Sequence, residues 1–204
     1  MLLSSGIYCL IAVAYLLNIL RPALVENTAD FIASCQTYEG GFSSASQPYF
    51  SSSSSTTLLN EPRPPLGEAH GGYTFCALAS WVMLQAYIPP SPSLNQRVNY
   101  KNLLRWLTQM QGTEIELGGF KGRTNKLVDG CYSWWVGGCF AFLEALGVGV
   151  SRDVPEGIGK GEEKDDEGEW DEVDDGLYNR KALQEYILYA GQDPAGGLRD
   201  KPPK

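Results

Sequence analysis

The sequence is short of the residues that most often mark a metal or redox site at first sight. Its 204 residues include one histidine, three methionines and five cysteines, and no two cysteines form a C-x-x-C pair. An odd number of cysteines in a chain of this size does not indicate a domain held together by disulfides. The cysteine pattern therefore favours a reducing compartment, and we expect a cytoplasmic protein.

The N-terminal apolar stretch also lacks what a targeting segment needs. Between Leu2 and Leu20 the polar interruptions are Ser, Asn and Tyr, with no basic region before the stretch and no small-residue cleavage site after it. Arg21-Pro22 ends it, as proline ends an ordinary helix. We therefore expect a buried helix here, and neither a signal peptide nor a membrane span.

Basic residues are outnumbered, 16 against 24 acidic ones, but the imbalance is local. Glu156–Gly176 contains eleven acidic residues and two lysines, a net charge of −9, so the remaining residues together carry +1. The folded part is therefore close to neutral, and the overall acidity does not argue against an anionic ligand. We expect no nucleic acid partner.

A weak internal repeat runs through the chain. A Gly-Gly pair followed by a large apolar residue occurs at 40–42, 118–120 and 196–198. Before each pair, apolar residues three or four positions apart predict an amphipathic helix. More uniformly apolar stretches, Tyr73–Tyr87 and Tyr132–Leu146, follow the first two pairs and predict buried helices. Such helix pairs indicate an all-α fold, an α/α toroid of which the chain holds an incomplete part. The spaced residues are Ala29, Phe31, Ile32 and Cys35; Leu103, Leu104, Leu107 and Met110; and Leu183, Tyr186, Ile187 and Ala190.

Two stretches interrupt this organisation. One is rich in Ser and Pro and the other is acidic, and neither composition buries enough apolar surface to offset the entropy of ordering. The sequence thus divides into five parts: 1–42, a helix pair; 43–67, a Ser/Pro-rich disordered insert; 68–150, central helices carrying the polar motifs; 151–177, an acidic disordered insert; and 178–204, a truncated last repeat.

The segment from 122 to 135 concentrates polar side chains that could carry chemistry. Arg123 and Lys126 lie three positions apart and together could hold a diphosphate, the first with its planar fork and the second as a point charge. Asp129 and Cys131 offer one oxygen and one thiolate to a metal such as Zn²⁺. The alternative is structural, with Asp129 capping a helix that begins near Cys131 and Cys131 serving as a small core residue.

His70 precedes a Gly-Gly pair at the expected start of a helix. There it could donate to an anion alongside free backbone N–H groups. A histidine satisfied by the backbone at a helix start is the alternative, and the local sequence does not choose between the two.

Two long motifs carry a family resemblance. Glu-Ala-His-Gly-Gly-Tyr-Thr-Phe-Cys at 68–76, followed by Gly-Gly-Phe-Lys-Gly-Arg-Thr-Asn-Lys-Leu-Val-Asp-Gly-Cys-Tyr-Ser-Trp-Trp at 118–135, is similar to the paired signature of protein prenyltransferase β subunits. The stretches 183–188 and 194–202 resemble the farnesyltransferase member more than its geranylgeranyl relatives. The resemblance covers nearly the whole chain outside the two inserts.

The resemblance implies a role for each matching residue. His70, Arg123, Lys126 and Tyr132 would bind the diphosphate of farnesyl diphosphate and act in catalysis, with Lys201 beside them; Tyr8, Tyr73, Cys76 and Trp135 would line the isoprenoid tunnel; Asp129 and Cys131 would ligate Zn²⁺; and Asp200 would lie near a Mg²⁺ ion. The activity it implies is farnesyl transfer to the cysteine of proteins ending in C-a-a-X, in a heterodimer with an α subunit.

The chain also departs from the family pattern. The family's third zinc ligand is a histidine expected beyond Lys204, and Ser5 stands where the family has an arginine. We therefore expect a fragment that binds zinc poorly and transfers no prenyl group, because catalytic zinc usually has three protein ligands. Two further hypotheses are the β subunit of geranylgeranyltransferase type I and an inactive module that binds an α subunit.

Overall fold

The computed structural model describes residues 4–47, 66–88, 98–149 and 176–201. Within these ranges the chain is helical, and β structure is confined to four isolated bridges. Most of each expected insert, 43–67 and 151–177, lies outside the described residues, so their predicted disorder stays a prediction. The all-α fold class is confirmed.

The helices fall close to where the repeat predicts them. The amphipathic helices before the Gly-Gly pairs are α3, α5 and α8, the last of which continues into a π-helical turn. The predicted helix at 132–146 is interrupted at the buried Val136 and forms two pieces, α6 and α7. The bounds are α1 Ser4–Leu16, α2 Pro22–Val25, α3 Thr28–Ser34, α4 Gly71–Met83, η1 Gln85–Tyr87, α5 Tyr100–Thr108, η3 Glu114–Glu116, α6 Tyr132–Trp135, α7 Gly137–Ala145, α8 Arg180–Glu185 and η4 Tyr186–Ala190.

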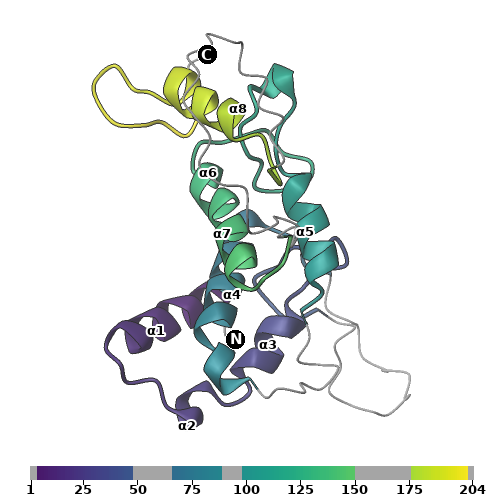
Figure 1. The fold of residues 1–204 in the computed structure, drawn as a ribbon, viewed down its shortest axis with the longest axis vertical. Helices are drawn as coiled ribbons and strands as arrows, with labels where there is room; N and C mark the ends of the chain where they lie inside the picture. Colours follow the sequence, from purple (N-terminus) through teal and green to yellow (C-terminus); the bar gives the residue numbers. More distant parts are fainter. Residues whose placement is uncertain (1–3, 48–65, 89–97, 150–175, 202–204) are drawn as a thin grey trace, which may run out of the picture.

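The apolar helices lie side by side, with α4 packed between α1 and α7. Figure 1 shows an elongated molecule in which α1, α2 and α3 occupy one end, α5, α6 and α7 the middle, and α8 the other end with the C-terminus. The order of the repeats along the sequence is therefore also their order along the long axis.

Burial differs sharply between the first two apolar helices. Every residue of α4 from Thr74 to Trp81 is buried. In α1 only the face with Ile7, Ile11 and Ala14 is buried, and on the other face Leu16 is 82% exposed. The expectation of a buried helix at 2–20 is thus wrong for one face, because among the described residues α4 covers only the opposite side. No helix in the described ranges is long and apolar enough to cross a membrane.

A glutamine at the first Gly-Gly turn joins one repeat to the next. The Gln36 Nε2 donates to the carbonyl of Gly40 at 2.8 Å and to that of Asn99 at 3.1 Å. Its Oε1 accepts from the backbone N–H of Asn99 at 2.8 Å. Asn99 is the N-cap of α5, where its own side chain accepts from a backbone N–H of the first turn. We call this pairing, a glutamine amide bonded to the backbone of the next helix's N-cap asparagine, the amide clamp.

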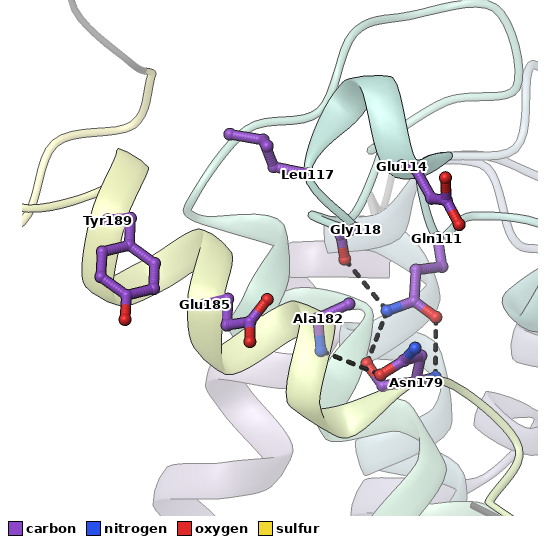
Figure 2. Close-up of a pocket in the computed structure, with 9 residues that line it drawn as sticks. Gln111, Glu114, Leu117, Gly118, Asn179, Ala182, Glu185 and Tyr189 are labelled. Carbon is purple, nitrogen blue, oxygen red and sulfur yellow. Dashed lines mark hydrogen bonds between the residues drawn. The ribbon is translucent and has the colours of Figure 1, made fainter.

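The second turn repeats the amide clamp. Gln111 donates to the carbonyls of Gly118 and Asn179 at 3.0 and 2.8 Å, and accepts from the N–H of Asn179 at 2.8 Å (Figure 2). Asn179 is the N-cap of α8, as Asn99 is of α5. In both turns the first glycine has positive φ, 118° at Gly40 and 68° at Gly118, a conformation that glycine adopts without penalty.

Candidate functional site

His70 is the N-cap of α4, and its contacts tie it to the backbone. Its Nδ1 accepts from the N–H of Gly72 at 3.1 Å, while the N–H of Gly71 donates to the carbonyl of Gly122 at 2.8 Å. These two amides are therefore not free for an anion, so that part of the sequence expectation is wrong. The Gly72 contact fits the structural alternative, a histidine satisfied by the backbone at a helix start, and a role of His70 in binding a diphosphate stays a prediction.

The other ring nitrogen of His70 meets Tyr132. The Nε2 lies 3.1 Å from the phenol oxygen. Burial, with the nearby Arg123 charge, holds the pKa of His70 below its usual value, so the ring is neutral near pH 7. Because Nδ1 is an acceptor, the single ring proton sits on Nε2 and is donated to Tyr132. The Tyr132 hydroxyl keeps its own proton to donate elsewhere.

Tyr132 is held over the backbone of Gly122. A Cβ built on Gly122 would lie 1.8 Å from the Tyr132 Cζ, so no other residue fits at this position without moving the ring. Burial, with the adjacent Cys131 and Asp129, raises the pKa of the Tyr132 phenol, which keeps it protonated as a donor. The position of the hydroxyl is therefore set from two sides, by His70 and by Gly122.

Tyr132 borders a cavity of about 250 Å³ that carries three cationic side chains. The Nη1 of Arg123 lies 3.2 Å from a carboxylate oxygen of Glu68, and the Nζ of Lys201 lies 3.6 Å from one of Asp129. Lys126 makes no ion pair with any described residue. The lining comprises Gly122, Arg123, Lys126, Leu127, Asp129, Tyr132 and Lys201. The structure thus brings together all the expected diphosphate ligands, with His70 adjoining through Tyr132.

A group of potential metal ligands adjoins the same cavity. One ligand atom each from Asp129, Cys131 and Asp200 all lie within 4.8 Å of one another. The Asp129 Oδ1 also accepts from the N–H of Cys131 at 3.3 Å, so Asp129 supports the start of α6 as well. The backbone carbonyl of Asp200 accepts from the N–H of Gly130, which fixes the C-terminal segment beside the motif.

The chemistry of this group fits a zinc ion. Burial, together with the hydrogen bond and the charge of Asp129, raises the pKa of the Cys131 thiol to about 12. Two carboxylates facing a thiol keep it protonated, and a divalent cation among the three reverses that preference. Modest contraction of the group would match zinc–oxygen and zinc–sulfur distances of roughly 2.0–2.3 Å. Cys131 is only partly buried, so the alternative of a core residue is not supported.

The four expected isoprenoid-tunnel residues lie on and around α4. Tyr8 and Trp135 both contact the ring of Phe75, with centroid distances of 6.0 and 5.3 Å. Tyr73 packs on His70 at 5.0 Å. Cys76 is buried, and burial raises the pKa of its thiol to about 11. The described residues form an aromatic cluster here, and the tunnel itself stays a prediction.

Three residues of the site were not predicted from the sequence. Phe75 is the centre of the aromatic cluster, since it also contacts Phe142 at 5.2 Å. Glu68 pairs with Arg123, and Gly122 provides the space for Tyr132. Glu68 and Phe75 lie within the first motif and Gly122 within the second, so their place in the motifs was the available signal.

Comparison with known proteins concerns the family and the fold of the chain. The prenyltransferase alpha-alpha toroid domain matches residues 5–204. The protein farnesyltransferase subunit beta of Pisum sativum is 36% identical over 235 residues, covering 97% of this chain and 49% of the relative. The corresponding subunit of Schizosaccharomyces pombe is 37% identical over 202 residues, covering 98% and 41%. The chain therefore spans about half the length, or less, of these curated relatives.

Geranylgeranyl enzymes also match. The geranylgeranyl transferase type-1 subunit beta of Arabidopsis thaliana is 34% identical over 145 residues, covering 69% of this chain and 32% of the relative. A solved structure of Candida albicans protein geranylgeranyltransferase-I complexed with GGPP covers 98% of this chain and 43% of its own, with a TM-score of 0.62 and 22% identity. That likeness concerns the fold. The repeat, the helix order and the family match agree, and the chain belongs to the prenyltransferase alpha-alpha toroid family.

Proposed function

We propose that this chain is the diphosphate- and metal-binding part of a protein farnesyltransferase β subunit. The observation that carries the proposal is the shared cavity, where three cations and the Tyr132 hydroxyl border a group of metal ligands. Asp129 both lines the cavity and belongs to the group of potential metal ligands. A diphosphate in this cavity would therefore lie next to the metal, as transfer to a metal-bound thiol requires.

The cationic side chains would hold the leaving group. Arg123 can exchange its exposed pairing with Glu68 for two parallel hydrogen bonds to a phosphate, since such surface pairs contribute little. Lys126 and Lys201 would add point charges, and Tyr132 a neutral donor fixed by His70. These groups would stabilise the negative charge that builds on the departing diphosphate.

Zinc, held by Asp129 and Cys131 with Asp200 in reach of the same ion, would supply acidification of the substrate thiol. Asp200 has a second proposed role, as a ligand of Mg²⁺ on the diphosphate. In the transfer, the substrate sulfur gives up its proton to solvent and forms a bond to C1 of the farnesyl group. The bond from C1 to the diphosphate oxygen breaks, and the diphosphate leaves with the electron pair.

The partners follow from the proposed reaction. They are farnesyl diphosphate, proteins ending in C-a-a-X and a farnesyltransferase α subunit, the last by analogy with the curated relatives, each of which is one subunit. We also propose a cytoplasmic location. The five free thiols of the chain support a reducing compartment.

Titration of the purified 204-residue chain with farnesyl diphosphate tests the proposal. We expect binding that weakens about tenfold in Lys126→Met and in Arg123→Gln, because each removes one charge-assisted contact. The exposed Lys101, on α5 and away from the cavity, gives the matched control Lys101→Met. Equal affinity in all four proteins would refute the assignment of the cavity.

The match to a geranylgeranyl subunit supports a second candidate, with the longer isoprenoid as donor. Competition between farnesyl and geranylgeranyl diphosphate for the chain discriminates the two, and preference for the longer donor would replace our assignment. The chain combined with an α subunit then tests transfer to a C-a-a-X peptide. Assembly without transfer would fit both the expected fragment and the third hypothesis, an inactive binding module, and the titration with farnesyl diphosphate separates them, because only the former should bind that ligand.

A further inference from the structure

Residues 121–128, which we call the cation loop, form a small hairpin that carries two of the cavity cations. A backbone bridge joins the first and last residues of the loop. At the tip, the N–H of Lys126 donates to the carbonyl of Arg123 at 3.2 Å. The two cations therefore flank a tight turn, and Thr124 is one of the two residues between them. The direction in which both cations point depends on how this turn is held.

The tip of the cation loop is joined to the rest of the described chain through two carboxylates. Arg123 pairs with Glu68, with 3.2 Å between nitrogen and oxygen. The hydroxyl of Thr124 donates to the Oε1 of Glu39 at 2.8 Å. These are the polar contacts that the side chains at 123–126 make with other described segments.

The two contacts differ in their fate when a diphosphate binds. Arg123 would leave Glu68, because its guanidinium is needed for the ligand and exposed ion pairs contribute little. Thr124 does not line the cavity, so its hydroxyl is not needed by the ligand. The contact of Thr124 with Glu39 is therefore the one that can persist and fix the loop tip while the cations are engaged.

Glu39 is itself held beside the other half of the site. Its second carboxylate oxygen, Oε2, accepts from the N–H of Ala69 at 3.3 Å, one residue before His70. The N–H of His70 in turn donates to the carbonyl of Phe42, in the same turn as Glu39, at 3.0 Å. Through its two oxygens, Glu39 thus joins the start of α4 to the cation loop.

The turn that carries Glu39 does not need a carboxylate for its own structure. The residues directly before the second and third Gly-Gly pairs are Leu117 and Ala195. Both of these turns still form, with positive φ at Gly118 and Gly196 and with the same kind of backbone bridge as the first turn. The side chain of Glu39 is therefore available for a role outside the repeat.

We propose that Glu39 is a positioning residue of the diphosphate site, which holds the cation loop against the start of α4 by accepting from Thr124. Glu39 does not line the cavity and acts through the loop. This proposal rests on the proposed function, because it concerns the geometry of the same site. A loop that is already held loses less freedom when the ligand binds, so its affinity for a diphosphate is higher.

Two measurements on the 204-residue chain test the proposal. Thr124→Val removes the hydroxyl donor at nearly constant shape, and should lower the NMR order parameters of the backbone amides at 124–126 from about 0.85 towards about 0.6. It should also weaken farnesyl diphosphate binding about fivefold, because the ligand must then order the loop. Thr124→Ser keeps the donor and should retain both parent values.

Two further variants separate the Glu39 contact from the loss of any hydroxyl. Thr108→Val removes a threonine hydroxyl whose hydrogen bond lies within α5, and should change neither quantity. In a Glu39→Ala background, Thr124→Val should cause no further fall in the order parameters, because the hydroxyl then has no carboxylate to donate to.

Three results would overturn the proposal. They are unchanged order parameters in Thr124→Val, lower order parameters with unchanged affinity, and equal effects of Thr108→Val. If the parent chain bound no farnesyl diphosphate, the proposed function would fail instead. The order parameters of the free chain would then still decide whether Glu39 holds the cation loop.

Discussion

Two regions meet at α4, and their side chains are of opposite kinds. Around Phe75 lies the aromatic cluster, which is uncharged, with Phe75 itself buried and Tyr8, Trp135 and Phe142 partly buried against it. Beyond the His70–Tyr132 contact lies the cation cavity, whose Arg123 and Lys201 are exposed ion-pair members. Exposed pairs contribute little to stability, while buried aromatic rings contribute much. The aromatic cluster therefore contributes mainly to folding stability, and the cavity with the cationic side chains contributes mainly to the proposed ligand binding.

Removing the centre of the aromatic cluster should have the largest effect. Phe75→Ala deletes a buried ring that contacts Tyr8, Trp135 and Phe142, and should lower the free energy of unfolding by about 3–5 kcal/mol. Denaturant unfolding measures the change. If the unfolding free energy fell by less than about 1 kcal/mol, the aromatic cluster would not be a main source of folding stability, and the contrast between the two regions would fail.

Gly122→Ala tests the border between the regions. The added methyl group must displace the Tyr132 ring, so we expect a loss of about 1–3 kcal/mol in unfolding free energy together with weaker farnesyl diphosphate binding. Gly6→Ala is the matched control, since a Cβ there meets no described atom. If Gly122→Ala changed neither quantity, the Tyr132 position would not matter to either region.

The pH dependence of stability should show the neutral state of His70. The folded pKa lies below the unfolded value of about 6.5, so below that pH the unfolded chain takes up a proton that the folded chain refuses. Stability should therefore be highest above about pH 6.5 and fall as the pH drops towards the folded pKa. In His70→Asn the asparagine still caps the helix but has no group that titrates in this pH range. If the variant showed the same dependence of stability on pH as the parent protein, His70 would not be its cause.

Lys126→Met should have the smallest effect on folding. Lys126 is exposed and makes no ion pair with the described residues. The unfolding free energy of the variant should therefore stay within about 0.5 kcal/mol of that of the parent protein. Thermal and denaturant melts check this, alongside the loss of ligand affinity. A marked loss of unfolding free energy would contradict the contrast between the two regions, because the cavity would then also contribute to folding stability.

Local pattern was enough to predict much of this architecture. The spacing of apolar residues gave α3, α5 and α8, and the Gly-Gly pairs marked the turns that follow them. The spacing of Arg123 and Lys126 predicted a shared anionic ligand, and the family resemblance added Tyr132 to the same expected ligand. These features depend on neighbours within a few residues, which is where periodicity carries information.

Features that depend on distant pairing could not be predicted in the same way. The clamp joins Gln36 to Asn99, and the metal group joins Cys131 to Asp200, over separations of 63 and 69 residues (200 − 131) that helical periodicity does not relate. The open face of α1 depends on which helices cover it, and composition alone suggested burial on all sides. These pairings and the exposure of α1 depend on which residues become neighbours in the folded chain, and the pattern of a single sequence does not contain that information.

The potential metal ligands Cys131 and Asp200 are far apart in the sequence, so a metal bound to both would close a long loop of chain. A metal held by Cys131 and Asp200 closes a loop of about 70 residues, which contains the whole acidic stretch 156–176. The entropy of closing a loop grows only with the logarithm of its length, so removing those 21 residues would change the closure free energy by only about 0.3 kcal/mol. Insertions between these ligands are therefore nearly neutral for metal affinity, and evolution could vary the length of this segment with little effect on the site.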